Sequence, residues 1–273
     1  GSRSTALAMA LHDDPRVRLH VEVDERSAGF LAVGLARVSG RPAAVVTTSG
    51  SATANLHPAV VEADQGRVPL LLLTADRPPE LRHTGANQAI DQIKLYGDAV
   101  RWFVEVGVPE DRDGVVAYWR STTCRAVAEA MGLRGPAGPV HANLAFREPT
   151  VPATDDGRSR AGGPFRQSLE GRPDRRAWTA VDLPPRTVPD AELQAFAGRV
   201  AGTERGLIVV GDTTARPGPV HALAAATGWP VVAEPTSGAR FGPHVVAHAG
   251  PLLSVDAFRE AHRPDLVVRV GRP

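Results

Sequence analysis

Short apolar runs alternate with helical patterns over the first 150 residues of the chain. Strands are expected at residues 19–23, 43–48, 70–74, 102–106 and 138–144, and helices at 25–36, 51–64 and 114–131. The strands are nearly continuous in apolar residues, which is typical of a parallel sheet covered by helices on both faces. The pattern therefore predicts an α/β fold.

The composition changes after residue 153. Residues 154–188 are polar and rich in glycine, proline and arginine, which predicts a linker. The alternation returns from residue 189, with strands expected at 207–211, 230–234 and 265–271. About 85 residues with three strands make a thin domain, near the size at which independent stability becomes marginal. We expect two domains, 1–153 and 189–273, the second of them truncated.

The composition and the net charge exclude several classes of protein. The chain is 42% hydrophobic and 22% charged with a formal net charge of +1, and Lys94 is its only lysine. The near-neutral charge argues against a nucleic-acid partner. No run approaches the length of a membrane span, so no membrane insertion is expected. The single cysteine, Cys124, excludes a disulfide framework and fits a reducing cytoplasm; we expect it to be a buried helical thiol.

The turn at residues 47–52 joins an expected strand to an expected helix. Its small residues would let a ligand approach the backbone N–H groups at the helix N-terminus, although the G-x-G-x-x-G pattern is missing. Residues 49–53 also imitate the nucleophile elbow of a serine hydrolase, with Ser51 as the hydroxyl, but nothing marks a partner Asp and His. A capped, closely packed helix start is the structural alternative.

Three other segments are candidates for chemistry. Asp24 and Glu25 open a helix directly after an expected strand. Either they are acids that the helix dipole stabilises at the helix N-terminus, or one of them presents a carboxylate at the sheet edge. The loops at 77–82 and 85–92 carry Arg, Asn and Gln, which suit carboxylate binding, or else are solvated connections. His244 and His248 have a spacing that suits a metal only on a helix, and the residues between them indicate extended chain, so no metal site is expected.

Four segments in order resemble the pyrimidine-binding domain of thiamine diphosphate-dependent enzymes. They are DERSAGF at 24–30, TTSGSATANL at 47–56, TADRPPEL at 74–81 and GANQ at 85–88. Residues 138–149 resemble the last strand and exit of that domain. Within the superfamily the sequence is most similar to the synthases of menaquinone biosynthesis, whose Gly-Ser-Arg motif matches residues 1–3. The resemblance implies a Rossmann-like pyrimidine-binding domain at 1–153 and an incomplete central α/β domain at 189–273.

The same resemblance implies roles for individual residues. Glu25 would be catalytic, with its carboxylate hydrogen-bonded to N1′ of the aminopyrimidine ring of thiamine diphosphate. Thr48, Ser49 and Gly50 would bind the same cofactor. Substrate-binding roles are implied for Ser2, Arg3, Arg77, Asn87 and Gln88. The implied reaction is a carbon–carbon bond-forming transfer, in which 2-oxoglutarate is decarboxylated and its succinyl unit adds to isochorismate.

Members of that family are longer and carry a diphosphate-binding domain, with a Gly-Asp-Gly…Asn signature for Mg²⁺, that is absent here. The resemblance therefore implies that the Mg²⁺ or Mn²⁺ ligands lie outside this chain and that the chain alone is inactive. It also implies a homodimer or homotetramer. Two alternatives stay open: another thiamine diphosphate enzyme, such as an acetohydroxyacid synthase or a 2-oxoacid decarboxylase, and a non-catalytic half of a split enzyme.

Overall fold

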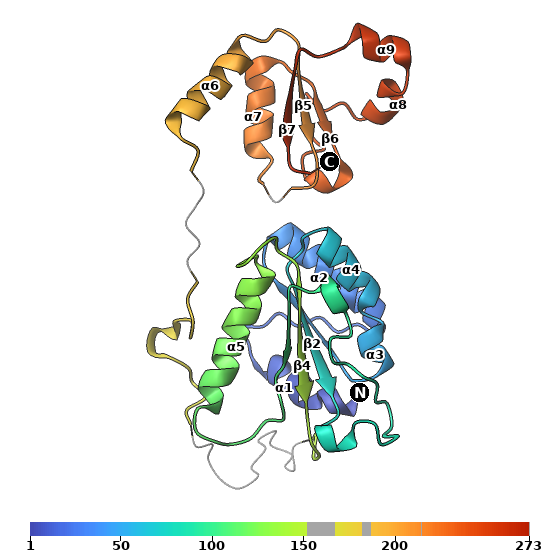
Figure 1. The fold of residues 1–273 in the computed structure, drawn as a ribbon, viewed down its shortest axis with the longest axis vertical. Helices are drawn as coiled ribbons and strands as arrows, with labels where there is room; N and C mark the ends of the chain where they lie inside the picture. Colours follow the sequence, from blue (N-terminus) through green and yellow to red (C-terminus); the bar gives the residue numbers. More distant parts are fainter. Residues whose placement is uncertain (152–166, 182–186, 214, 273) are drawn as a thin grey trace. The chain divides into compact units, whose positions relative to one another are not determined.

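The computed structural model describes residues 1–151, 167–181, 187–213 and 215–272. The chain divides into two compact units, Gly1–Leu183 and Pro184–Pro273, each with its own sheet (Figure 1). The sequence places the corresponding boundary at residues 154–188. Among the described residues, no helix is long and apolar enough to cross a membrane.

The first unit is built on a four-stranded, wholly parallel sheet in the order β1-β2-β4-β3. The strands are β1 (Ala43–Thr47), β2 (Leu70–Asp76), β3 (Trp102–Glu105) and β4 (Pro139–Ala145). The two central strands, β2 and β4, are the most buried. Because all four strands run the same way, their carboxyl ends meet at one edge of the sheet, where open α/β folds bind ligands.

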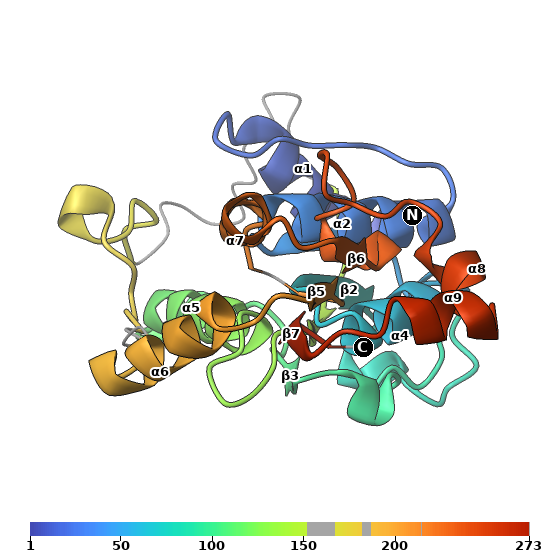
Figure 2. The same ribbon diagram turned by 90° about the horizontal axis from the view of Figure 1, so that it is seen from above.

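Helices cover both faces of this sheet. They are α1 (Thr5–Asp13), α2 (Glu25–Ser39), α3 (Ser51–Ala54), α4 (His57–Gln65) and α5 (Val115–Ala130), with short 3₁₀ turns η1 (Ser2–Ser4), η2 (Pro79–Leu81) and η3 (Gly97–Ala99). Leu70 and Leu72 pack with α2 and α4, whereas Leu71 packs with α5 on the opposite face. Figures 1 and 2 show the same layering. The α/β class predicted from the sequence is confirmed.

Helix α2 has well-defined ends. The Asp24 side chain caps its start by accepting a hydrogen bond of 2.8 Å from the Arg26 N–H, and Gly40 ends it in the left-handed conformation, with φ of 65°. Gly29 lies where α2 meets α4, and a Cβ on it would come within 2.8 Å of the Ala59 Cβ. A glycine therefore permits this close helix contact.

Two predicted elements in this unit are wrong. Residues 19–23 form no strand, and Val21 and Val23 are 84% and 101% exposed. The alternation of apolar residues there favours a strand, but no described strand pairs with the segment, and an unpaired strand has no hydrogen bonds to hold it. The helix expected at 51–64 is broken into α3 and α4 at Asn55 and Leu56.

The second unit holds a three-stranded parallel sheet in the order β6-β5-β7. Its elements are α6 (Asp190–Ala201), β5 (Gly206–Val210), α7 (Gly218–Thr227), β6 (Val231–Ala233), η5 (Pro235–Ser237), α8 (Ala249–Leu253), α9 (Asp256–Ala261) and β7 (Leu266–Val270). Ile208, Val231 and Trp229 lie at the centre of its core. The three strands occur where the sequence predicts them.

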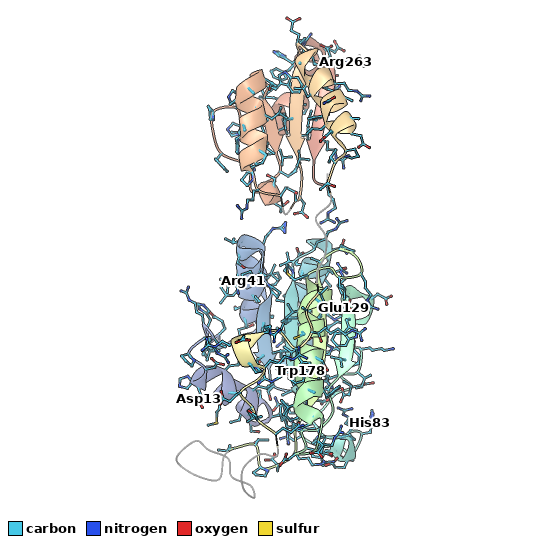
Figure 3. All side chains as sticks on the ribbon, turned by 90° about the vertical axis from the view of Figure 1, so that its left-hand side faces the viewer. Asp13, Arg41, His83, Glu129, Trp178 and Arg263 are labelled. Carbon is cyan, nitrogen blue, oxygen red and sulfur yellow. The ribbon has the colours of Figure 1, made fainter. Side chains whose placement is uncertain are left out.

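Part of the predicted linker packs onto the first unit. The Gln167 side chain accepts a 3.1 Å hydrogen bond from the Val116 N–H of α5, and the Arg172 guanidinium lies 4.6 Å from the ring centroid of Trp178. Residues 173–175 form the short turn η4 (Pro173–Arg175), and Figure 3 shows Trp178 on this segment. Cys124, on α5, is half-buried rather than buried. The rest of the predicted linker, 154–166 and 182–186, lies outside the described residues.

Candidate functional site

A row of polar side chains crosses the otherwise apolar sheet close to its carboxyl edge. Thr47 of β1 is in register with Thr74 of β2, Thr74 with Asn143 of β4, and Asn143 with Glu105 of β3. Thr47, Thr74 and Asn143 are buried. Burying polar groups is costly unless they are hydrogen-bonded, so such a row needs a network of partners.

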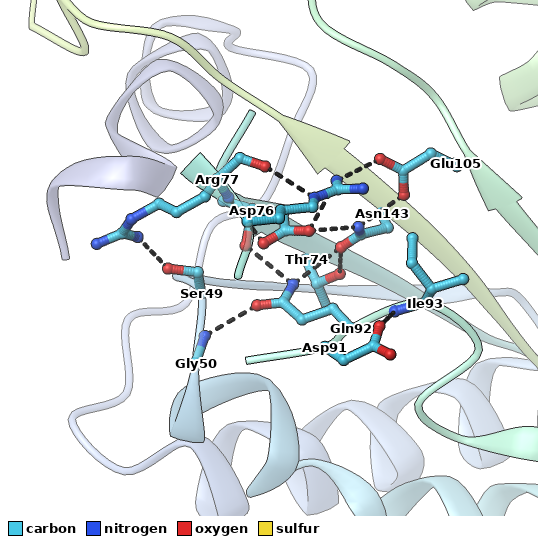
Figure 4. Close-up of polar contacts among 12 residues, drawn as sticks. Ser49, Gly50, Thr74, Asp76, Arg77, Asp91, Gln92, Ile93, Glu105 and Asn143 are labelled. Carbon is cyan, nitrogen blue, oxygen red and sulfur yellow. Dashed lines mark hydrogen bonds and ion pairs between the residues drawn. The ribbon is translucent and has the colours of Figure 1, made fainter. Parts of the chain in front are cut away.

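The turn after β1 is joined to the loop after β2 through Ser49. The buried Ser49 hydroxyl donates to the carbonyl of Gln88 at 2.9 Å. It also accepts a hydrogen bond from the Arg77 guanidinium (Figure 4). The same guanidinium donates to the carbonyl of Asn87 at 2.5 Å, and the Gln88 side-chain amide donates to the Ser49 carbonyl at 3.1 Å. These bonds fix Arg77, the turn and the 87–88 loop as one cluster.

Gly50 continues this turn in a conformation that requires glycine. Its φ of 81° and ψ of −139° are accessible to almost no other residue, and a Cβ would come within 3.0 Å of the Gln88 carbonyl oxygen. Its N–H donates to the side-chain oxygen of Gln92 at 2.9 Å. The hydrogen bond from Gly50 to Gln92 thus holds the turn against the loop that contains Gln92. Lys94, two residues after Gln92 on that loop, is exposed and has a φ of 53°.

Two buried guanidiniums converge at the same edge. Arg3, in η1, donates to the Phe146 carbonyl at 2.8 Å and pairs with the exposed carboxylate of Glu148 at 2.9 Å. Arg77 is 9% exposed and Arg3 5%. Burial lowers the pKa of Arg77, and the positive charge of Arg3 lowers that pKa further. Guanidiniums are the side chains that bind carboxylates in two-pronged fashion, so a buried pair of them is a candidate site for an anion.

Three buried polar atoms near this edge have no hydrogen-bond partner among the described residues. They are the Nε of Arg3 and the hydroxyls of Thr47 and Thr48. Gly1 lies against Thr48, since a Cβ on Gly1 would come within 2.8 Å of that hydroxyl. Buried polar atoms in native proteins are almost always paired, so these atoms indicate that a ligand or water completes the site.

Glu25 lies at the first turn of α2 and is half-buried. Its Oε2 accepts a hydrogen bond of 3.2 Å from the side-chain amide of Asn55, between α3 and α4. Among the described residues this is its only hydrogen bond, so Oε1 is open to another donor. No described hydrogen bond or ion pair joins Glu25 to the arginine cluster.

The structure brings together most of the residues predicted for the site. Arg3, Thr48, Ser49, Gly50, Arg77, Asn87 and Gln88 gather at the carboxyl edge. Ser2 is adjacent in sequence but exposed, and Asn87 contributes its carbonyl rather than its exposed side-chain amide. Ser51 is exposed, and no described His or Asp contacts it, so the structure offers no support for a serine hydrolase.

Sequence reasoning assigned no role to the individual residues that support this cluster, although Arg82 and Gln92 lie in the candidate loops 77–82 and 85–92. Asn143 donates its side-chain amide to Asp76 at 2.8 Å and to Glu105 at 2.7 Å, and Arg82 pairs with both carboxylates at 2.9 and 2.5 Å. Gln92 lies between Asn143 and the turn. A detectable signal existed: an asparagine and a histidine interrupt the apolar run of β4.

That histidine, His141, is fully buried beneath the site. Its Nε2 lies 2.7 Å from the Thr74 hydroxyl, and its Nδ1 has no partner among the described residues. Burial lowers the pKa of His141 from 6.5 to about 4, so the ring is neutral at physiological pH. Burial also raises the pKa of Tyr96, which packs edge-on against His141 and donates to the Thr53 carbonyl at 2.7 Å.

Among the described residues, no group of three or more His, Cys, Asp or Glu side chains is arranged to hold a metal ion. The acids of the site are already engaged by Arg82 and Asn143. The acids at this edge therefore serve the hydrogen-bond network of the described residues.

The first unit is thus an α/β domain with a candidate site at its carboxyl edge, and comparison with known families shows what it is similar to. Residues 1–95 match the family of thiamine pyrophosphate enzymes described as their N-terminal TPP binding domain. The matched segment contains every residue that the sequence predicted for the site.

Comparison with individual proteins covers the whole chain. It is 56% identical over 273 residues to the 2-succinyl-5-enolpyruvyl-6-hydroxy-3-cyclohexene-1-carboxylate synthase of Thermobifida fusca. It is 44% identical, over 275 and 281 residues, to the synthases of the same name from Saccharopolyspora erythraea and Geobacillus kaustophilus. The chain spans about half the length of these curated relatives, 46% in each case. The resemblance inferred from the sequence is confirmed.

Proposed function

We propose that the chain is part of a thiamine diphosphate-dependent synthase of menaquinone biosynthesis. The enzyme would decarboxylate 2-oxoglutarate and add the succinyl unit to isochorismate, giving 2-succinyl-5-enolpyruvyl-6-hydroxy-3-cyclohexene-1-carboxylate. The printed names of the relatives support this reaction. The observation that carries it is the buried pair Arg3 and Arg77, because both substrates bear carboxylates.

The residues at the carboxyl edge fit a cofactor with an aminopyrimidine ring. When bound, thiamine diphosphate supplies the electron sink for decarboxylation. Glu25 would hold a proton at N1′ of the ring with its open Oε1, while Asn55 holds Oε2. The unpaired Thr48 hydroxyl and the bare backbone of Gly50 would contact the cofactor. Ser49 would act indirectly, since its hydroxyl is already engaged by Arg77 and Gln88.

Substrate carboxylates would bind to the arginine pair. Arg77 is held by Ser49 and the Asn87 carbonyl, so its charge is oriented before any substrate arrives. Arg3 presents an unpaired Nε at the same place. The exposed side chains of Ser2 and Asn87 would add hydrogen bonds at the rim, and Gln88 would hold the loop in place.

Other parts of the complete enzyme would supply what this chain does not. Mg²⁺ or Mn²⁺ would be held by residues outside the described ones, together with the diphosphate group. The complete protein would work as a homodimer or homotetramer, because the family's cofactor lies between the domains of two subunits. The single cysteine is in keeping with a cytoplasmic location.

The test uses the complete protein from the native reading frame. With thiamine diphosphate and Mg²⁺, we expect it to consume isochorismate and release CO₂ from 2-oxoglutarate in equal amounts, and to do neither when one substrate is omitted. CO₂ release without isochorismate consumption would indicate another thiamine diphosphate enzyme. Activity only after addition of a second polypeptide would indicate a split enzyme.

A further inference from the structure

Gln92 connects the Gly50 turn to the two central strands of the sheet. It is 1% exposed, and both ends of its side-chain amide are used. The oxygen accepts the Gly50 N–H at 2.9 Å, and the nitrogen donates to the Ala75 carbonyl at 3.2 Å and to the Asn143 side-chain oxygen at 2.9 Å (Figure 4). No water is needed to complete these bonds.

Charged groups further along the network fix which way this amide points. Asp76 and Glu105 both accept from the Asn143 nitrogen, so that nitrogen faces the carboxylates. The Asn143 oxygen must then face Thr74 and Gln92, and it accepts from both at 2.9 Å. An acceptor at this position requires the Gln92 nitrogen, which leaves the Gln92 oxygen for Gly50.

The Gly50 N–H is the part of the turn that most needs such a partner. Glycine adopts this backbone conformation without steric strain, but it is also free to leave it, so a hydrogen bond to the Gly50 N–H helps to hold the turn. The two residues before it carry the unpaired Thr48 hydroxyl and the Ser49 hydroxyl that holds Arg77. A shift of Gly50 would therefore displace both the expected cofactor contact and the substrate arginine.

We propose that Gln92 is a positioning residue, oriented through Asn143 by the Asp76–Glu105 carboxylate pair, that holds the Gly50 turn in its ligand-binding geometry. The inference rests on the proposed function, since thiamine diphosphate is the ligand expected at that turn. Gln92 itself touches no substrate or cofactor. Its effect reaches the site only through the Gly50 N–H.

The first experiment replaces Gln92 with Met, which has a similar shape but no N–H donor and only a weakly accepting sulfur. The matched control is Gln194→Met, on the exposed surface of α6 in the other unit. In the complete protein we expect at least about tenfold faster hydrogen exchange at the Gly50 amide, because a buried hydrogen bond is lost. The thiamine diphosphate concentration for half-saturation should rise about tenfold, with kcat changed less than about threefold.

The second experiment replaces Gln92 with Glu. The carboxylate keeps an acceptor for Gly50 but turns an acceptor toward the Asn143 oxygen, whereas the protonated form restores the missing donor. Thiamine diphosphate affinity relative to wild type should therefore recover as the pH falls. A purely structural role would lower the melting temperature and leave that pH profile parallel to wild type, so parallel profiles would overturn the inference.

Different results would contradict the positioning role of Gln92 and the proposed synthase function. Unchanged Gly50 exchange in a folded Gln92→Met protein would overturn the positioning role, whatever reaction the enzyme catalyses. If Gln92→Met does not fold, the pH profile of Gln92→Glu decides the question. A wild-type protein that consumes neither substrate would overturn the proposed function, while the exchange rate of Gly50 would still decide the role of Gln92.

Discussion

Arg3 and Arg77 lie near each other with both guanidiniums buried, although 74 positions separate them in the chain. Burial lowers the pKa of Arg77, and the charge of Arg3 adds to that effect. Glu148 pairs with Arg3 from an exposed position, and Asp76 is already engaged by Arg82. The pair therefore carries a positive charge that a bound anion would stabilise.

Succinate, a dicarboxylate of the size of the transferred unit, should raise the melting temperature of the chain. Ligand binding to the folded state stabilises it by about 2.7 kcal/mol at one hundred times Kd. Differential scanning fluorimetry would measure the shift. Arg77→Gln should abolish it, whereas Arg41→Gln, on an exposed loop, should not. An equal shift with chloride at matched ionic strength would argue against a specific anion site.

Glu25→Gln should abolish most turnover of the complete protein while leaving it folded. The amide cannot hold the proton at N1′, and loss of a proton-transferring group costs about a hundredfold or more in rate. Because Glu25 is half-buried and has one described hydrogen bond, the melting temperature should change little. Glu22→Gln, three residues earlier and exposed, is the control. Near-normal rates for Glu25→Gln would refute its assignment.

His141 should make the fold sensitive to acid. Its pKa is about 4 when folded and 6.5 ordinarily, so the unfolded state binds more protons between these values. The free energy of unfolding should fall as the pH drops through that window, by about 3 kcal/mol in all. Urea denaturation at pH 7 and pH 4 would show a smaller loss for His141→Gln than for wild type. The exposed His20→Gln should keep the wild-type loss.

Two glycines of α2 should respond oppositely to alanine. At Gly29 the new methyl group would lie 2.8 Å from the Ala59 Cβ, so Gly29→Ala should destabilise the fold by about 1–3 kcal/mol. At Gly34 nothing lies within 4 Å, so Gly34→Ala should stabilise it by about 0.5–1 kcal/mol through helix propensity. Urea unfolding would measure both. Equal effects would contradict the close contact between α2 and α4.

The fold was predictable where apolar pattern and tertiary context agree. The continuous apolar runs of β2 and β4 indicate central parallel strands, and both lie there. Residues 19–23 alternate apolar and polar positions as a strand would, but no described strand pairs with them, which a local pattern cannot reveal. The same limitation applies to residues 167–181, whose polar composition predicts a linker although Gln167 bonds to α5.

Many of the residues that gather at this edge were predicted from the sequence, but the hydrogen bonds between them were not. The motifs placed Ser49, Arg77 and Gln88 at the site, but not the hydrogen bonds that make Ser49 a support for Arg77. Gln92 lies in the candidate loop 85–92, but its bond to Asn143, 51 positions away on β4, was not predicted. That bond depends on how the loop folds back over the carboxyl edge of the sheet, which no local pattern in the sequence reveals.

Lys94 makes the supporting loop chemically addressable. As the only lysine, it carries the one side-chain amine of the chain, and it is exposed two residues beyond Gln92. Once the α-amino group is blocked, an amine-reactive dye would label Lys94 alone among these 273 residues, on the loop that holds Gly50. Its emission would follow the motion of that loop in the native sequence, with no engineered cysteine and with Cys124 left unmodified.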